Sequence, residues 1–554
     1  MKMQTRHVSL YSLSMASSTS SPFRSQPKAS WLALVLLLVF GACGLWVIIR
    51  FGSAPAPYPV DAYYYLAKAE NLRDGRGLTT YWNDGLDRKF FPLQSIALAA
   101  LVFLRYWWPS YWLALSVLAY AVNGVVLWKL LRRIEPSEPV RFATLAFWLC
   151  NPNVLLWSSV PYAEGLASAL AWGAVAVCAR GWRNVPARRF LAAALLGGLA
   201  VTARPEAVAL ALAFAILVMV QAAREGRRAI PWRRLAAGAA LFAAPFAAYW
   251  LSLPSATESP RLLYVHEFFE RFSPAAVLDN FLDLLYSILM EKGVEIAFLQ
   301  GQGAWPALGA LRYGIDVVFA LSLLLALAGR LGRLARWTAA GMLGYQLLHA
   351  LWHYAYGRFD YPVVPLAAYI FASGLAALFR IGRRGIFPIP PRGVGLQLLS
   401  SRSAAYFAAA AAIAATMALY GVLAIMRQQY FISRMDVRVP SQVRAVVLAQ
   451  LVTSLGEGDN YLCSTADLWL AYGVGSMRGA RAWFEEAKPD FGEAPFAPEK
   501  ALDFMERRRI SWIVTRRSLE KWLDDYHIPV ERRAEFVPRL ETPQIEVIER
   551  IVGQ

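Results

Sequence analysis

Repeated apolar runs constrain the fold of this chain more than any other feature. The first run, Trp31–Ile49, contains no charged residue. A helix of about 20 apolar residues is long enough to cross the hydrocarbon core of a bilayer. Further apolar segments occur at roughly 111–131, 142–157, 163–179, 189–203, 205–223, 235–252, 313–329, 336–354, 361–379 and 404–426. The chain is therefore predicted to be a polytopic α-helical membrane protein with about 11 transmembrane helices.

The composition agrees with a membrane protein and argues against a nucleic-acid-binding protein. Hydrophobic residues make up 57% of the chain and charged residues 17%, and the formal net charge is +18. The basic residues lie in short clusters between apolar runs, and no basic face or RNA-binding motif is present, so no nucleic-acid partner is expected. The four cysteines form no CxxC pair and indicate little about redox compartment.

The basic loops predict the orientation of the chain in the membrane. Five Arg-rich connections should be cytoplasmic under the positive-inside rule: 131–141, 180–189, 224–234, 329–336 and 380–393. If the short apolar run Phe91–Tyr106 crossed the bilayer, these loops and the basic N-terminus would face opposite sides. We therefore expect 91–106 to be a half-inserted or interfacial helix.

Two further expectations concern the ends of the chain. Residues 1–30 are Ser-rich and basic, which is typical of a disordered cytoplasmic tail, and the first span is expected to be retained rather than cleaved. Residues 430–554 read differently from the rest, with short strands and amphipathic helices. Predicted domains are thus the tail 1–30, a transmembrane domain 31–429 and a small extracytoplasmic α/β domain 430–554.

This topology places many ionisable residues on the outer side of the membrane. The outward connections are 50–110, 158–162, 203–205, 253–312 and 355–360, of which 50–110 and 253–312 are large loops. They contain or adjoin Asp61, Lys89, Tyr162, Glu164, Arg204, Glu206, Arg358 and Asp360. Ionisable residues at membrane depth are costly and usually face a cavity or serve function. Their convergence on one face predicts a functional site there.

Several of these residues also have a purely structural interpretation. Asp61 suits a general base, but it also suits an N-cap of the following helical segment, and one carboxylate can do both. Lys89 could bind an anionic group or extend toward lipid headgroups. Glu164, close to Tyr162, begins a helix, where a carboxylate is favourable in any case.

The remaining candidates divide in the same way. Arg204 and Glu206 flank Pro205 and could pair with each other, whereas an arginine at an apolar rim also binds phosphate well. Arg358 is the better phosphate candidate of the late loop. His349 and His353 have an i,i+4 zinc-like spacing, but no HExxH motif or third ligand accompanies them, so aromatic packing is preferred. No cofactor is expected, and a divalent cation is left open.

Taken in order, the motifs resemble those of bacterial GT-C glycosyltransferases, the group that includes protein O-mannosyltransferases and lipid A aminoarabinose transferases. The resemblance covers roughly residues 30–430. It is carried by "DAYYYLAKAENLRDG", "FFPL", "NPN", "YAEG", "RPEA" and "YGRFDYPVVP".

The resemblance implies a polyprenyl-phosphate-linked sugar donor and inverting transfer on the outer face of an inner or plasma membrane. It implies Asp61 as the catalytic base or acceptor-positioning group, and Lys89 and Arg358 as ligands of the lipid phosphate. Arg204, Glu164, Glu206, Tyr162 and His353 complete the expected substrate-binding set.

The sequence also departs from both patterns. Asp61 is followed by Ala62 where mannosyltransferases have an Asp-Glu pair, and "RKFFPL" replaces a Lys-Pro-Pro element. Neither sugar nor acceptor (protein, lipid or glycan) is therefore carried over. The alternatives are a transporter or flippase of a lipid-linked or anionic solute, and a glycan polymerase or ligase. No GxSxG or P-loop motif favours a hydrolase or an ATP-driven pump.

Overall fold

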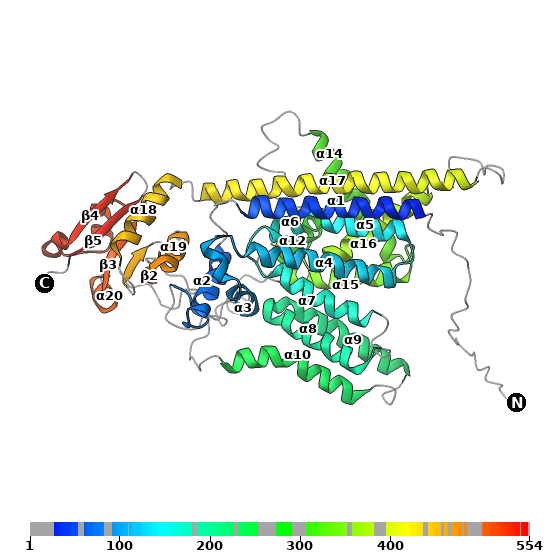
Figure 1. Ribbon diagram of the computed structural model, residues 1–554, viewed down its shortest axis with the longest axis horizontal. Coiled ribbons are helices and arrows are strands. Elements are labelled where there is room, and N and C mark those ends of the chain that lie inside the picture. The colour runs from blue at the N-terminus through cyan, green and yellow to red at the C-terminus, as the bar shows by residue number, and fades with distance from the viewer. Residues whose placement is uncertain are drawn as a thin grey trace.

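A computed structural model of the protein shows an elongated helical bundle with a small α/β unit at one end (Figure 1). It describes residues 27–53, 60–81, 91–108, 110–179, 185–225, 231–252, 273–290, 306–351, 357–381, 395–435, 441–455, 459–463, 468–478, 481–484, 501–542 and 545–551. The predicted tail thus lies outside the described residues, apart from 27–30, which begin the first helix.

Helices of 7 to 41 residues form the bundle. They are α1 (Pro27–Gly52), α4 (Leu113–Ile134), α5 (Glu138–Leu149), α6 (Pro152–Ser158), α7 (Glu164–Cys178), α8 (Ala187–Ala203), α9 (Val208–Glu225), α10 (Trp232–Ser252), α12 (Pro274–Ser287), α14 (Pro306–Leu327), α15 (Arg333–Ala350), α16 (Val364–Ile381) and α17 (Gly395–Met435). Short helices lie at their ends: α2 (Val60–Arg73), α3 (Leu93–Ala99), η1 (Val102–Tyr106), η2 (Pro205–Ala207) and η4 (Gly357–Asp360).

Five stretches of the described chain are long and apolar enough to cross a membrane, so the chain is a multi-pass membrane protein. They are Ala33–Gly52, Leu113–Ile134, Trp232–Leu251, Gly309–Leu327 and Ala404–Met426. Shorter apolar helical stretches follow at Glu164–Cys178, Pro205–Val220 and Val364–Phe379. A count of about 11 spans remains a prediction.

The segment 91–106 does not form one long helix. It divides into the seven-residue α3 and the five-residue 3-10 helix η1. At about 1.5–2 Å rise per residue, neither piece can cross a hydrocarbon core about 30 Å thick.

The single apolar segment expected at 142–157 is wrong in one respect, because the chain breaks inside it. The α5 helix ends at Leu149, and α6 begins at Pro152. Proline lacks an N–H and disfavours the helical conformation in the residue before it. Asn151 is accordingly extended, and its side chain accepts hydrogen bonds from the N–H groups of Asn153 and Val154. Hydropathy alone does not register such a break.

The C-terminal unit is a five-stranded mixed sheet with strand order β2-β1-β3-β5-β4. Strands β1 (Asn460–Cys463), β2 (Arg481–Phe484) and β3 (Ile510–Thr515) are parallel neighbours, whereas β5 (Glu546–Arg550) pairs antiparallel with β3 and with β4 (Phe536–Glu541). The helices around them are α18 (Ser441–Ser454), α19 (Leu468–Arg478), α20 (Ala501–Arg508) and α21 (Leu519–Asp525). The short strands and helices expected for residues 430–554 are thus present in this unit.

Side chains alternate between the two faces of this sheet, as a strand requires. Leu462 and Ile513 belong to the core under α20 and α21. Their neighbours Tyr461, Cys463 and Val514 belong to the opposite core, which is continuous with buried residues of α18, α19, α2 and the helical bundle. The sheet is therefore packed against the rest of the protein on one face.

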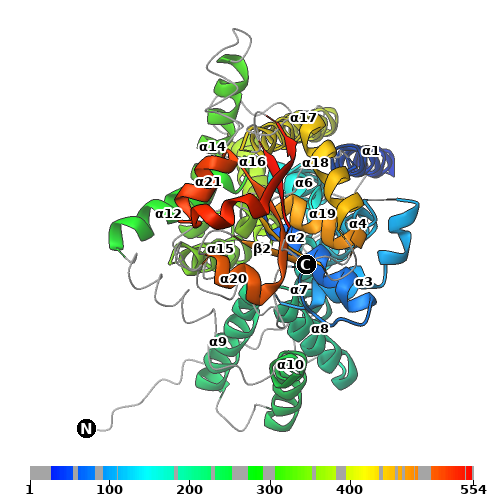
Figure 2. The ribbon, with the colours of Figure 1, turned by 90° about the vertical axis from the view of Figure 1, so that its left-hand side faces the viewer.

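Two arrangements in the figures position the functional site. In Figure 1, α17 lies beside α1 and continues past it toward α18 and the sheet. Figure 2, viewed from the sheet end, shows α2 beside α19 at the centre of the molecule, and these two helices are in contact. Helix α2, which follows α1, thus lies between the bundle and the C-terminal unit.

Candidate functional site

The first element of the site is an ion pair between two distant segments. Asp61 lies in the first turn of α2, and Arg358 lies in η4 just before α16. Asp61 Oδ2 accepts a hydrogen bond from Arg358 Nη1 at 2.6 Å, and the side chains are 21% and 16% exposed. Because α2 begins at Val60, Asp61 is not the N-cap residue, although its charge still favours the helix N-terminus.

This ion pair keeps the arginine charged. Burial has the largest single effect and lowers the pKa of Arg358, but the nearby acidic groups, Asp61 first among them, together outweigh it, so the pKa lies above its usual value. A short charge-assisted hydrogen bond of this kind also fixes both side chains in direction.

The second element centres on Arg204, at the end of α8. Its Nη2 lies 3.3 Å from Glu164 Oε1 and 3.0 Å from Glu206 Oε1, and Tyr65 of α2 also forms a hydrogen bond with it. Glu164 is the first residue of α7 and is only 2% exposed. A carboxylate this deeply buried requires a partner, and Arg204 is the cation beside it.

Phe359 joins the two elements. The guanidinium carbon of Arg358 lies 5.2 Å from the centre of its ring, and that of Arg204 lies 5.6 Å from it. On the bundle side, His349 stacks on the same ring with centroids 4.9 Å apart. Arg358 also lies 5.4 Å from the ring of Tyr162. Two cations are thus held near each other by the faces of aromatic rings, an arrangement suited to an anion with more than one negative oxygen.

The segment that carries Arg358 is anchored on several sides. Asp360 is buried and accepts hydrogen bonds from Ser287 Oγ at 2.7 Å and from Gln346 Nε2 at 3.4 Å. The hydroxyls of Tyr361 and Ser158 lie 3.1 Å apart, and the indole N–H of Trp172 donates to the carbonyl of Pro362. Arg358 is therefore presented by a rigid support formed from α6, α7, α12 and α15.

Six of the predicted site residues come together in this way: Asp61, Tyr162, Glu164, Arg204, Glu206 and Arg358. Lys89 and His353 lie outside the described residues. The structural alternative for Arg204 and Glu206 also holds, because the two side chains do pair.

Two contributors were not singled out from the sequence. In the sequence, Tyr65 belongs to a run of three tyrosines of the kind found at membrane interfaces. In the structure it is hydrogen-bonded to Arg204, and its position four residues after Asp61, on the same side of a helix, was the available signal. Phe359 carried no signal beyond its place next to Arg358.

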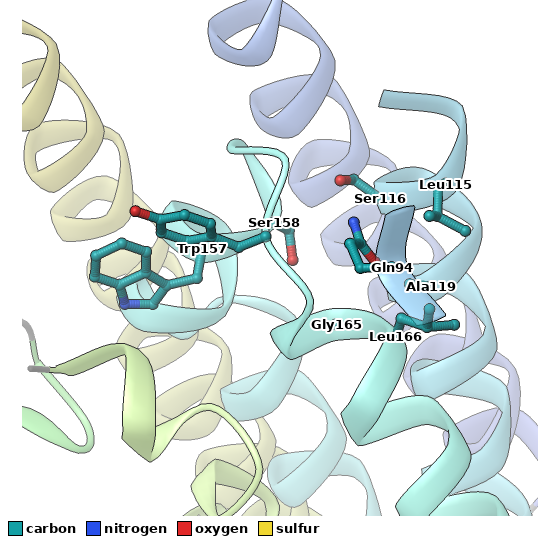
Figure 3. A pocket seen from close by; sticks show the side chains of 9 residues that line it. Gln94, Leu115, Ser116, Ala119, Trp157, Ser158, Gly165 and Leu166 are labelled. Atoms are coloured by element: carbon teal, nitrogen blue, oxygen red, sulfur yellow. The ribbon is translucent and has the colours of Figure 1, made fainter. Parts of the chain in front are cut away.

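A small cavity adjoins the site behind Tyr162. It is lined by Gln94, Leu115, Ser116, Ala119, Trp157, Ser158, Tyr162, Gly165 and Leu166. In Figure 3 the Gln94 amide lies between Ser158 and the α4 residues Ser116 and Ala119. Its volume of about 10 Å³ is close to the minimum for one water molecule, so as it stands the cavity suits a structural water rather than a substrate.

The described part of the chain shows no cluster of metal-binding side chains. Among those residues, no group of three or more His, Cys, Asp or Glu side chains is arranged to hold an ion. His349, one member of the i,i+4 pair, is packed between the rings of Tyr345 and Phe359.

Comparison with known proteins finds similar structures but no similar sequences. No protein-family model matches the chain, and no curated protein matches it. Among solved structures, ArnT from Cupriavidus metallidurans bound to undecaprenyl phosphate superposes with a TM-score of 0.62, covering 94% of this chain and 98% of that one at 13% identity. The apo state of the same ArnT gives a TM-score of 0.60 at 14% identity, with the same coverage.

This likeness shows the fold. At such coverage and TM-score, most of this chain has a fold similar to that of this ArnT. The GT-C-like fold expected from the order of the motifs is therefore confirmed.

Proposed function

We propose that this protein is a membrane glycosyltransferase. It transfers a sugar from a polyprenyl-phosphate-linked donor to an acceptor hydroxyl or amine on the outer face of the membrane, with inversion at the anomeric carbon. The observation that carries the proposal is the contact of Asp61 with Arg358 beside Arg204, in a fold like that of an ArnT bound to undecaprenyl phosphate.

In this proposal Asp61 is the general base. The acceptor oxygen or nitrogen attacks the anomeric carbon while the bond between that carbon and the phosphate oxygen breaks. The acceptor proton passes to the Asp61 carboxylate, and the polyprenyl phosphate leaves with the bonding electron pair. General base catalysis of this kind contributes roughly 10²–10⁴-fold to the rate.

Arg358 and Arg204 are the proposed ligands of the donor phosphate, and Lys89 is a third by resemblance. Negative charge grows on the leaving phosphate in the transition state, and fixed guanidinium groups in a partly dry site stabilise it. A phosphate that binds Arg358 competes with Asp61 for the same N–H groups. Donor binding thus releases the carboxylate to accept a proton when a substrate is present.

The proposed topology follows from the basic loops. About eleven spans place the N-terminus inside, the loops 50–110 and 253–312 outside, and residues 430–554 outside on an inner or plasma membrane. The division of 91–106 into two short helices supports this arrangement, because every basic loop then shares the inner face with the N-terminus.

A reconstitution experiment tests the proposal. Purified protein in liposomes receives synthetic undecaprenyl-phosphate sugars, and two quantities are followed: the release of undecaprenyl phosphate and the labelling of envelope acceptors. The expected result is release with transfer in the wild type and its loss in Asp61→Asn. Movement of the lipid-linked sugar across the bilayer without transfer would instead identify a flippase.

A further inference from the structure

Glu70 is a buried carboxylate that the proposed reaction does not use. It lies near the end of α2 and is only 1% exposed. Its Oε1 accepts a hydrogen bond from the hydroxyl of Tyr472 at 2.6 Å, and its Oε2 accepts one from Tyr81 at 3.0 Å. Arg105 Nη1 lies 3.5 Å from the same Oε2. Burying a carboxylate is costly, and these donors are what makes it tolerable.

The partners of Glu70 come from separate parts of the chain. Tyr472 belongs to α19 of the C-terminal unit, Arg105 to η1, and Tyr81 to the loop after α2. The loop is attached to the sheet as well, because the N–H of Ala482 in β2 donates to the carbonyl of Tyr81. Glu70 thus connects helix α2 to the loop that follows it, to η1 and to the C-terminal unit.

Both tyrosines are held in the donating form. Burial, followed by the negative charge of Glu70, raises the pKa of Tyr81 and of Tyr472 above the ordinary tyrosine value. They therefore remain protonated throughout the physiological range and keep donating to the carboxylate.

Glu70 and Asp61 lie on opposite faces of one short helix. Nine residues separate them, and at about 100° per residue they point in opposite directions, about 13 Å apart along the axis. Asp61 faces Arg358 in the bundle, whereas Glu70 faces the C-terminal unit. Tyr63, seven residues before Glu70 and on the same side of the helix, packs on Tyr472 with ring centroids 5.5 Å apart.

We propose that Glu70 is a positioning residue: by fastening α2 to Tyr472 and Tyr81, it sets the place of Asp61 relative to Arg358. The inference rests on the proposed role of Asp61. Helix α2 is short and is pinned at each end by one carboxylate, so a shift at the Glu70 end moves the other end with it. The C-terminal unit then acts in the reaction without contacting the reacting atoms.

The test combines kinetics with a readout that needs no activity. Glu70→Gln keeps the size of the side chain but presents an amide N–H to a donor hydroxyl, and Tyr472→Phe removes one donor only. We expect kcat to fall about 10²-fold in Glu70→Gln and less in Tyr472→Phe, with the KM for the lipid-linked donor unchanged in both. Glu520→Gln, an exposed glutamate of α21, is the matched control and should behave as the wild type.

Two further measurements separate positioning from general damage. Glu70→Gln should cause no additional loss in an Asp61→Asn background, because both act through the same carboxylate. Hydrogen exchange of the full-length protein in nanodiscs should become faster at residues 60–66 in Glu70→Gln and in Tyr472→Phe. An equal loss in the Asp61→Asn background, or unchanged exchange at residues 60–66, overturns the inference.

Failure of the proposed function is distinguishable from failure of this inference. If the wild type transfers no sugar from any donor tested, the proposed function fails, and exchange at residues 60–66 alone decides about Glu70. If the wild type and Asp61→Asn behave as proposed while Glu70→Gln and Tyr472→Phe keep the wild-type kcat, only the role of Glu70 is overturned.

Discussion

Asp61 Oδ2 and Arg358 Nη1 lie 2.6 Å apart, although 297 residues separate them in the chain. The contact joins the helix after the first span to the turn before a late span. A candidate base and a candidate phosphate ligand thus hold each other in place.

Replacing Asp61 by Asn removes the proton acceptor and keeps the shape of the side chain. We expect transfer from the lipid-linked donor to fall by roughly 10²–10⁴-fold, the usual contribution of a general base. Radiolabelled sugar transfer in proteoliposomes measures it. Asp74→Asn, at an exposed carboxylate just after the same helix, is the control and should keep full activity. Wild-type transfer by Asp61→Asn would remove this residue from the mechanism.

Arg204 is expected to matter for stability as well as for substrate binding. Arg204→Met leaves Glu164 buried without its cation, which typically costs about 3–5 kcal/mol. The melting temperature of the purified protein in detergent should fall clearly, and Glu164→Gln in the same chain should restore part of it. Arg188→Met, at an exposed position of α8, should leave the melting temperature as it is. Equal stability of Arg204→Met and the wild type would show that the buried pair is dispensable.

Close helix packing at Gly198 gives a prediction unrelated to catalysis. A Cβ at this position of α8 would meet the backbone carbonyl of Phe242 in α10, which cannot move aside as a side chain could. Gly198→Ala should destabilise the protein by about 1–3 kcal/mol. Gly341→Ala in α15 is the matched control, since nothing lies within 4 Å of its new methyl group. It should be neutral or stabilising by up to about 1 kcal/mol.

The stability of the C-terminal unit should depend on pH in the acid range. Hydrogen bonds from Arg532, then from Arg550, lower the pKa of Glu506; Arg532 likewise lowers that of Glu535, against the opposing effect of burial. A carboxyl whose pKa is lower in the folded than in the unfolded protein stabilises the folded state. This contribution is complete above the unfolded pKa of about 4.3 and is lost as the pH falls through the folded pKa.

Thermal denaturation of the full chain, followed by circular dichroism between pH 3 and pH 7, measures this effect. In Glu506→Gln, the melting temperature should fall less steeply toward acid pH than in the wild type. Near neutral pH, its dependence on pH should be similar in both proteins. An acid limb of unchanged steepness in the variant would assign the pH dependence to other carboxyls.

The orientation of the chain can be checked with single cysteines in a cysteine-free background. Ser53→Cys, at the end of α1, should react with a membrane-impermeant maleimide from outside. Arg188→Cys, at the start of α8, should react only after the membrane is permeabilised. The reverse pattern would place Asp61 in the cytoplasm and contradict the proposed reaction.

The basic loops predict that the candidate site residues share a face of the membrane, because loop charge sets topology, and six of the predicted residues lie together in the structure. The sequence did not predict which residues touch. The pairing of Asp61 with Arg358, and of Glu164 with Arg204, depends on how helices distant in the chain pack, and no short pattern encodes that.

Aromatic residues were the harder part of the site. Tyr65 and Phe359 are of residue types that commonly pack at a membrane interface, so the sequence does not distinguish them. Their contacts with Arg204 are seen only in the structure. The break at Asn151 was missed for a different reason. Apolar residues on both sides of Asn151–Pro152 favour a single continuous segment, whereas the backbone chemistry of this pair ends one helix and begins the next.

The 41-residue helix α17 has a consequence for how such a chain can change over time. Each residue of a helix advances its far end by about 1.5 Å and rotates it by about 100°. One inserted residue would therefore rotate every later residue of α17 by more than a quarter of a circle relative to its contacts with α1. We therefore expect related proteins to differ more in the residues of this helix than in its length.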